Sequence, residues 1–401
     1  MAQIDAQARA FPPEIESGLS DVCAQVAVIV EAICGSKPRA KDVSDRFGLT
    51  AKLGWQFWNV AYGGRATAMR NLPSDQGFEA LARAIKTLGV SEELLHSLDE
   101  ARANLKGVFA VHAEDREMLE MLVDSRAENL SEESATRWRR QAFVGNSFSF
   151  GVRAKCLLSC GILFPAAIKG RFSMVRLHGL VDLIRNRAGV RWPIASLRVE
   201  KAGEERTYRR EPLFTGEWHP EEVPLLREFC SQPVPVATRR VESETIYDEL
   251  APGLVGLTGK STIFAGEVIH NVGPSFGSYE GEVAFFGSGV RTPAEFLICD
   301  HIVHSSLFPG VERELCVYSE LATVHARDDK DRIDVPEKLE SLGRGLGRIR
   351  TADVPRYDEL LRHVFDAIHQ DPNEFDVFRA RMAFPPIPTS VMIRHPMPTE
   401  S

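Results

Sequence analysis

The chain has 401 residues, which is long enough for two or three domains with their own cores. Apolar residues make up 44% and charged residues 26%, and these ordinary proportions exclude general disorder. The formal net charge of -8 argues against a protein that coats nucleic acid nonspecifically, but it permits a local basic surface.

Cysteine usage and the N-terminal sequence bear on the compartment. The seven cysteines are an odd number scattered among apolar neighbours, which is typical of buried free thiols in a reducing compartment. The first residues lack the basic start and apolar run of a signal peptide. The longest aliphatic stretch, residues 26–33, is interrupted by Glu31 and is too short to span a bilayer. We therefore expect a cytoplasmic protein.

The first third of the chain has a helical pattern. Residues 1–18, with their Phe-Pro-Pro sequence, are expected to form a flexible tail, and residues 19–127 an all-helical domain. Ser20 and Ser91 are each placed to cap the start of a helix. Between and beyond them, apolar residues recur three or four apart over residues 78–88 and 118–123. The sequence thus predicts several amphipathic helices around one core.

Residues 40–61, AKDVSDRFGLTAKLGWQFWNVA, contain a short helix, a turn and a second helix. Val43 and Phe47 lie four apart on one helical face, and Gly48 can turn the chain through a positive φ angle. Thr50 is a suitable N-cap for the next helix, because its hydroxyl can accept a hydrogen bond from a free backbone amide.

This segment resembles the helix-turn-helix DNA-binding superfamily. The resemblance implies that the second helix lies in the major groove of duplex DNA and that two copies of the chain read two half-sites as a homodimer. A polar stripe on that helix suits base edges, formed by Lys52, Gln56 and Asn59 after the capping Thr50. Phosphate contacts are expected from Arg39, Lys41 and Arg65.

Local charge agrees with this reading, and two features of the second helix favour a different one. Residues 37–70 contain seven basic and two acidic residues, so the segment is net basic. Gly54, however, occupies a position where the superfamily usually carries an aliphatic residue. Trp55, Trp58 and Tyr62 form a second apolar face, which is typical of a helix buried on two sides. A purely structural helical core is therefore the alternative.

Beyond residue 127 the pattern changes. We interpret residues 128–142 as a linker or exposed helix, residues 143–384 as an α+β domain with a mainly antiparallel sheet, and residues 385–401 as a proline-rich tail. Helices are expected after Ser173, through residue 184, and from about 353 to 368. The expected strands are residues 197–199 with 206–210 as their hairpin partner, then 262–270, 282–286 and 314–318.

Asp300, His301 and His304 are the strongest chemical cluster in this larger region. Thr292, Pro293 and Glu295 have the form of a helix start, and a helix reaching residue 307 would place Asp300 and His304 on one face. Such a group could bind a divalent metal or carry a base. If the segment is instead a strand, the two histidines point to opposite faces and cannot chelate together.

No sequence motif predicts a cofactor. The glycines around Lys260 lack phosphate-loop spacing, and a strand-like run follows them instead of a helix. The sequence therefore favours a transcriptional regulator with a helical DNA-binding head and a C-terminal domain that binds a small-molecule effector or dimerises. The alternatives are a metal-dependent enzyme centred on Asp300, and an interaction protein that binds no nucleic acid.

Overall fold

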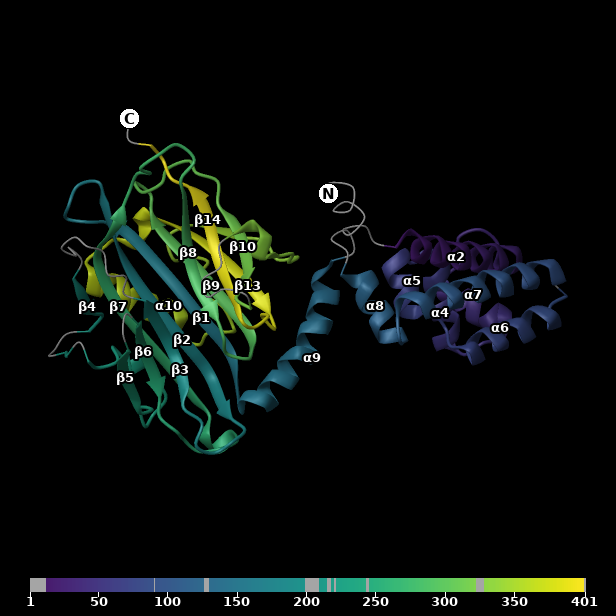
Figure 1. Ribbon diagram of the computed structural model, residues 1–401, viewed down its shortest axis with the longest axis horizontal. Helices are drawn as coiled ribbons and strands as arrows, with labels where there is room; N and C mark the ends of the chain where they lie inside the picture. Colours follow the sequence, from purple (N-terminus) through teal and green to yellow (C-terminus); the bar gives the residue numbers. More distant parts are fainter. Residues whose placement is uncertain are drawn as a thin grey trace. The chain divides into compact units, whose positions relative to one another are not determined.

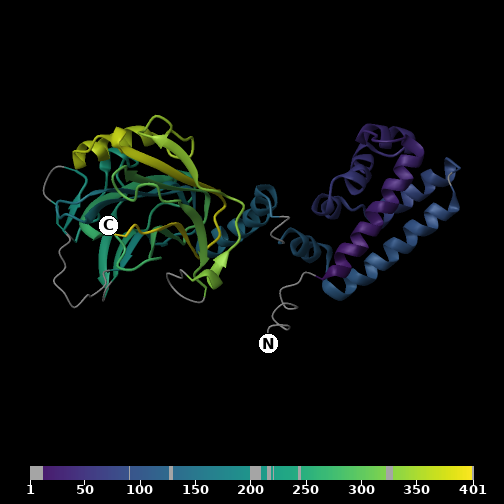
Figure 2. The same ribbon diagram turned by 90° about the horizontal axis from the view of Figure 1, so that it is seen from above.

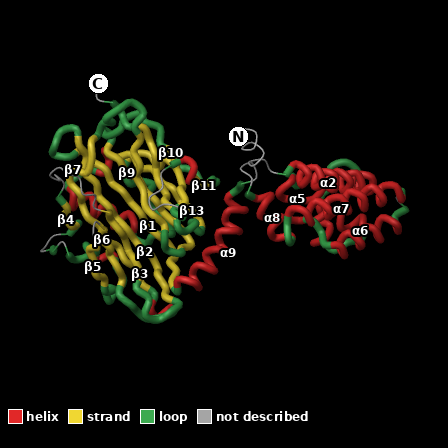
Figure 3. The backbone as a smooth tube through the Cα atoms, in the orientation of Figure 1, coloured by secondary structure: helices red, strands yellow, loops and turns green. Residues whose placement is uncertain are grey.

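The structure is a computed structural model that describes residues 12–89, 91–125, 130–198, 209–214, 218–219, 221–242, 245–321 and 328–399. The chain divides into two compact units, Met1–Ser131 and Glu132–Ser401. Helices form the first unit, whereas strands dominate the second (Figures 1 and 3). The predicted α+β class with a mainly antiparallel sheet is confirmed.

The described part of the first unit consists of helices around one core. They are α2 (Pro13–Cys34), α3 (Ala40–Phe47), α4 (Ala51–Tyr62), α5 (Arg65–Asn71), α6 (Asp75–Thr87), α7 (Glu92–His112) and α8 (Arg116–Asp124). Their starts follow local chemistry, because side-chain oxygens of Thr50, Ser74, Ser91 and Asp115 each accept a backbone N–H of the first turn.

Helix α2 is the central helix of this core. Its buried residues, Ile15, Leu19, Val22, Val26, Ile29 and Val30, recur at helical spacing and pack with apolar residues of the other helices. Among the described residues, α2 alone is long and apolar enough to cross a membrane. A third of the residues in its most apolar 18-residue segment are buried. Buried helices of globular cores have the same length and composition.

The second unit has helices α9 (Glu132–Phe150) and α10 (Tyr357–Ile368) in its described part. Its strands are β1 (Val152–Pro165), β2 (Arg171–Arg185), β3 (Trp192–Arg198), β4 (Arg210–Pro212), β5 (Ala237–Glu242), β6 (Thr245–Leu250), β7 (Ser261–Pro274), β8 (Val283–Val290), β9 (Ala294–His304), β10 (Glu314–Ser319), β11 (Arg332–Ile333), β12 (Glu340–Arg344), β13 (Phe375–Ala383) and β14 (Thr389–Pro396).

These strands form one large sheet and two small ones. The seven-stranded sheet has the order β12-β13-β9-β1-β2-β7-β4, and β1 and β9 run parallel while its other pairs are antiparallel. The smaller sheets have the orders β11-β10-β14-β8 and β3-β6-β5. In Figure 2, α10 is the yellow-green helix that covers one side of the large sheet.

The large sheet is covered on both faces. Residues such as Cys156, Leu158 and Ile298 form one face and pack against α10. The opposite face has two separate cores: Leu297 and Met382 pack against the four-stranded sheet, whereas Leu180 and Ile263 pack against the three-stranded sheet. Two small sheets therefore share one face of the large sheet, and a strip of that face lies between their cores.

Three segments of the second unit form strands, whereas the sequence predicts a helix after Ser173, a helix or a strand after Thr292 and a tail over residues 385–401. The segment after Ser173 is strand β2, and the segment after Thr292 is strand β9. Both are central strands that are buried on both faces, so their apolar residues do not follow the alternating pattern of a strand. The resulting spacing of apolar residues resembles that of a helix. Thr292 is not a helix cap, because its Oγ1 accepts a hydrogen bond from Trp192 Nε1 at 2.8 Å. The supposed tail 385–401 contains strand β14, which pairs with β10 and β8.

Other boundaries also change. Helix α2 begins at Pro13, within the expected tail 1–18. Residues 128–142 are expected to be a linker or an exposed helix, and helix α9 begins inside this segment and continues beyond it to Phe150. Strand β3 pairs with β6, and β4 pairs with β7, so these two strands are not a hairpin. Residues 199–208, which include most of that expected hairpin, lie outside the described residues. The expected strands near residues 262, 282 and 314 and the helix near 353 are confirmed as β7, β8, β10 and α10.

Candidate functional sites

The predicted turn between α3 and α4 is present with its expected chemistry. Gly48 has φ 63° and ψ 30°, a left-handed conformation that a residue without Cβ adopts at little cost. Leu49 N–H donates to the Ser44 carbonyl at 2.9 Å and closes the end of α3. Thr50 Oγ1 then accepts the Leu53 N–H at 3.3 Å and caps α4. The backbone geometry of this segment is therefore set by residues 48–50.

Gly54 allows α3 and α4 to pack closely. A Cβ added at Gly54 would lie 2.6 Å from Ser44 Cβ and 2.7 Å from Ser44 N, well inside normal contact distance. Ser44 is buried, and its Oγ donates to the Lys41 carbonyl at 2.8 Å. The glycine that lowers helix propensity is thus required by the close approach of the two helix backbones.

The exposed face of α4 differs from the predicted polar stripe. Lys52 is exposed and Gln56 is half-buried, but Asn59 is only 6% exposed. The Asn59 Nδ2 donates to the Trp55 carbonyl of its own helix at 2.9 Å. Asn59 is therefore removed from the set of candidate base contacts. The accessible part of this face is the N-terminal half of α4.

Trp55 was not predicted to belong to the exposed face. Its side chain is 50% exposed, three residues from Lys52 and hence on the same side of the helix. Trp58 instead lies half-buried and donates its Nε1 hydrogen to the Pro38 carbonyl at 2.8 Å. The predicted second apolar face is therefore split: Trp58 packs on the segment before α3, whereas Trp55 contacts solvent. The i, i+3 spacing of Lys52 and Trp55 was the available sequence signal.

The predicted phosphate contacts are exposed. Arg39 and Lys41 lie at the start of α3, and within the described ranges neither they nor Lys52 form a salt bridge. Arg65 pairs with Glu16 at 3.5 Å, but its side chain is 54% exposed. An ion pair this exposed contributes roughly 0–1 kcal/mol, so a phosphate can compete for the guanidinium.

Asp300 belongs to a buried ion pair and cannot serve as a metal ligand in this arrangement. Its carboxylate accepts hydrogen bonds from Arg379 Nε at 2.8 Å, Arg379 Nη2 at 2.6 Å and the Tyr357 hydroxyl at 2.7 Å. Asp300 and Arg379 are directly opposite each other on β9 and β13, and Tyr357 begins α10. Burial, followed by the nearby Asp300 carboxylate, raises the pKa of Tyr357 well above its usual value. The hydroxyl therefore remains a hydrogen-bond donor.

The two histidines of the same cluster point away from each other, as the strand alternative required. His301 lies on the opposite face from Asp300, stacked on Phe286 with ring centroids 4.9 Å apart. His304 contacts Ser306 and Glu374, about 13 Å along the strand from Asp300 at 3.3 Å per residue. No group of three metal-binding side chains occurs among the described residues. The alternative of a metal centre at Asp300, His301 and His304 is therefore wrong.

Sequence reasoning missed a row of polar residues across the other face of the large sheet. Strand register aligns His301 (β9), Gly161 (β1), Arg176 (β2) and Glu267 (β7) as successive neighbours. Arg176 and His178 are two apart in the otherwise apolar run of residues 174–181, which was the available sequence signal. Their partners are far apart in sequence, so the row could not be predicted before the strand order was known.

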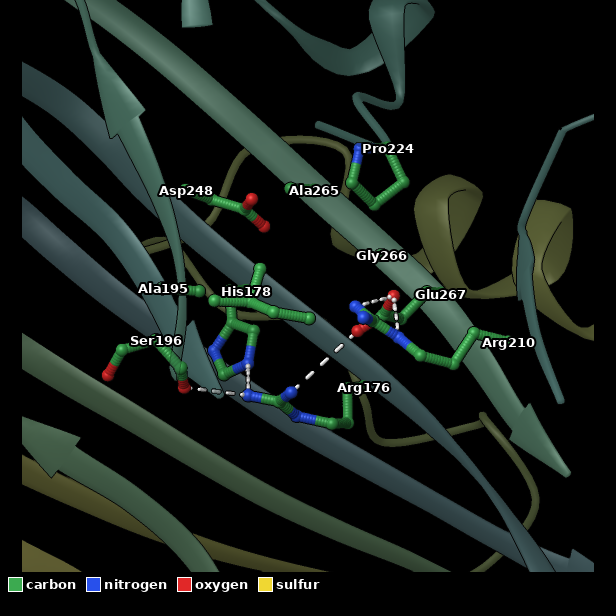
Figure 4. A pocket seen from close by; sticks show the side chains of 11 residues that line it. Arg176, His178, Ala195, Ser196, Arg210, Pro224, Asp248, Ala265, Gly266 and Glu267 are labelled. Atoms are coloured by element: carbon green, nitrogen blue, oxygen red, sulfur yellow. Dashed lines mark hydrogen bonds and ion pairs between the residues drawn. The ribbon is translucent and has the colours of Figure 1, made fainter. Parts of the chain in front are cut away.

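Figure 4 shows part of this row, where two guanidinium groups meet one carboxylate. Arg210 Nε donates to Glu267 Oε2 at 2.9 Å, and Arg176 Nη1 lies 3.7 Å from Glu267 Oε1. Arg176 Nη2 also donates to the Ser196 carbonyl at 3.2 Å and lies 3.3 Å from His178 Nε2. Burial and the Arg176 charge lower the pKa of His178 to about 3, so its imidazole is neutral.

Comparison with known proteins assigns no family. No protein-family model matches the chain, and no curated protein matches it.

Proposed function

We propose that the protein is a DNA-binding transcriptional regulator. The helix pair α3–α4 in the first unit would contact duplex DNA, and the second unit would bind a small-molecule effector or form a homodimer. The observation that carries the proposal is the left-handed glycine turn, which joins two closely packed helices and leaves the N-terminal half of α4 exposed.

The accessible residues of α4 suit a groove contact. In helix-turn-helix units the N-terminal residues of the second helix contact base edges. Here the equivalent part of α4 presents Lys52 and Trp55, with Gln56 half-buried beside them. Lys52 can donate to guanine acceptors, and Gln56 can bond adenine if its side chain extends. The base-contact set is therefore Lys52 and Gln56, with Trp55 as an apolar neighbour.

Exposed positive charge on the helix pair supports the proposal. Arg39 before α3, Lys41 on α3 and Lys52 on α4 are exposed cations without salt bridges in the described part of the chain. Phosphate neutralisation by such groups makes DNA affinity fall as salt rises. A single small unit of this type binds weakly, so a homodimer reading two half-sites is expected.

The test is selection of random-sequence duplex DNA by the full-length protein at two salt concentrations, followed by sequencing. The proposal expects an enriched site with two-fold symmetry and weaker retention at the higher salt. Absence of retention at the lower salt would contradict DNA binding. With DNA binding excluded, the half-exposed Trp55 would be explained as a contact for a protein partner.

Charge-matched variants identify the surface. Lys52→Ala is expected to weaken binding of the selected site about tenfold or more, because one base or phosphate contact is lost. Lys86→Ala removes the same charge from an exposed position on α6 and is expected to change affinity less than about twofold. Equal effects of the two substitutions would show that only the overall charge matters. Dissociation constants from fluorescence anisotropy provide the comparison.

A further inference from the structure

A cavity of about 120 Å³ lies where the polar row passes beneath the four-stranded sheet. The large sheet contributes Ser159, Gly161, Arg176, His178 and His301 to its wall. Strands β8 and β14 contribute the opposite wall, with Phe285, Phe286 and Ile393. The cavity therefore has a polar side on one sheet and an apolar side on the other.

Gly161 keeps the polar side open. It lies between His301 and Arg176 in the row, where any other residue would project a side chain into the space. A Cβ built at this position would meet only Leu163 Cδ1, at 3.8 Å. The hollow is thus a gap between an imidazole and a guanidinium, created by the missing side chain of one residue.

The polar side has positive charge and an unused hydrogen-bonding atom. Arg176 and Arg210 share the single carboxylate of Glu267, and no other carboxylate pairs with either guanidinium among the described residues. His301 is 1% exposed, and its Nε2 has no hydrogen-bond partner within the described ranges. Burial keeps the pKa of His301 well below its usual value, so the neutral ring offers one donor and one acceptor.

Both features favour an anion with a hydrogen-bonding group. A buried positive charge and a buried unpaired polar atom are each costly unless a partner is present. The carboxylate of Asp300 cannot be that partner, because it lies on the opposite face of the sheet with Arg379. A bound anion would satisfy Arg176 and His301 together.

The apolar wall and the volume restrict the ligand further. A cavity of about 150 Å³ accommodates benzene, so this smaller space suits a ligand of about five or six non-hydrogen atoms. Phe286 and Ile393 would cover a short hydrocarbon tail. We propose that the cavity binds a short-chain organic carboxylate, with its carboxylate on Arg176 and His301 and its tail on Phe286 and Ile393.

This inference rests on the proposed function, in which the second unit binds a small-molecule effector. It identifies the chemical class of that effector. Its test measures ligand binding without DNA. Failure here would leave the DNA-binding proposal standing, and failure of the DNA selection would leave this site standing.

The experiment is isothermal titration calorimetry and thermal unfolding of the full chain with n-butyrate. Butyramide, which has the same number of non-hydrogen atoms and no charge, and inorganic phosphate, which has charge and no tail, are the comparators. The proposal expects saturable binding of butyrate with a raised Tm, and at least tenfold weaker binding of both comparators. Equal binding of butyramide, binding of phosphate alone, or no butyrate binding at millimolar concentration would each overturn it.

Two variants locate the site. Gly161→Val fills the hollow, keeps every polar side chain and suits a strand, so it is expected to weaken butyrate binding at least tenfold. His301→Phe keeps a ring against Phe286, removes both ring nitrogens and is expected to weaken binding as well. Gly145→Ala on α9, where an added Cβ meets nothing within 4 Å, is the control with unchanged affinity. Wild-type butyrate affinity in folded Gly161→Val would place the ligand elsewhere and overturn the assignment.

Discussion

At the scale of single residues, glycines decide where this chain can form a site. Gly54 lets two helix backbones approach, and Gly161 leaves a hollow between two polar side chains. The sequence identifies Gly54 as an unfavourable helix residue but cannot show the reason, because Ser44 lies on another helix. Gly161 has no local signature at all, because its neighbours in the row come from three other strands.

Gly54→Ala is expected to destabilise the first unit despite the better helix propensity of alanine. The new Cβ would overlap Ser44, and overpacking of this kind costs roughly 1–3 kcal/mol, which exceeds the gain of about 1 kcal/mol in propensity. Gly107→Ala is the matched control. It lies inside α7 with nothing within 4 Å of an added Cβ, so it is expected to stabilise by about 0.5–1 kcal/mol. Urea unfolding followed by circular dichroism checks both; stabilisation by Gly54→Ala would contradict the close packing.

At the scale of elements, the sequence predicts what depends on local chemistry. The caps of α4 and α7, the glycine turn after α3 and the strand β7 could be predicted, because each depends on residues adjacent in the chain. Strands β2 and β9 could not, because both of their faces are buried and the alternation that marks a strand is lost. The assignment of β9 also determined whether Asp300 could join a metal site. A correct strand prediction would have excluded that site from the sequence alone.

The buried pair of Asp300 and Arg379 joins β9 to β13, and the Tyr357 hydroxyl links α10 to Asp300. Asp300→Asn is expected to lower the free energy of unfolding of the second unit by about 3–5 kcal/mol, because it leaves the Arg379 charge buried without its counter-charge. Asp376→Asn, also on β13, removes a carboxylate paired with the exposed Arg344 and is expected to cost less than about 1 kcal/mol. Chemical denaturation of the two variants provides the comparison. A cost below 1 kcal/mol for Asp300→Asn would show that the pair is not needed for stability.

At the scale of the whole molecule, each unit contains its own core. The apolar cluster of the first unit runs from Ile15 to Val123, and the clusters of the second unit contain only residues from Val152 onward. The chain length alone allowed two or three domains; the structure has two compact units, with the boundary near residue 131 and α9 in the second unit.

Fragments 1–131 and 132–401 are therefore each expected to fold when expressed alone. The first should have a helical circular dichroism spectrum, and the second a spectrum dominated by strands. Each should unfold cooperatively, since a domain with its own core behaves as one cooperative unit. A fragment that lacks a cooperative transition would show that its core depends on the other unit. If both fold, DNA selection and butyrate titration can be repeated on the separate units.

Strand β9 places two polar residues of different character on consecutive positions, Asp300 toward α10 and His301 toward the four-stranded sheet. In a strand, a shift of one residue exchanges the two faces. Such a shift, in either direction, would move the carboxylate to the face of the four-stranded sheet and leave Arg379 opposite a residue without a negative charge. Most apolar neighbours on β9 would tolerate the exchange, because both faces are buried. The charged pair therefore does what hydrophobic patterning cannot do in a strand of this kind: it gives β9 one permitted alignment with its neighbours.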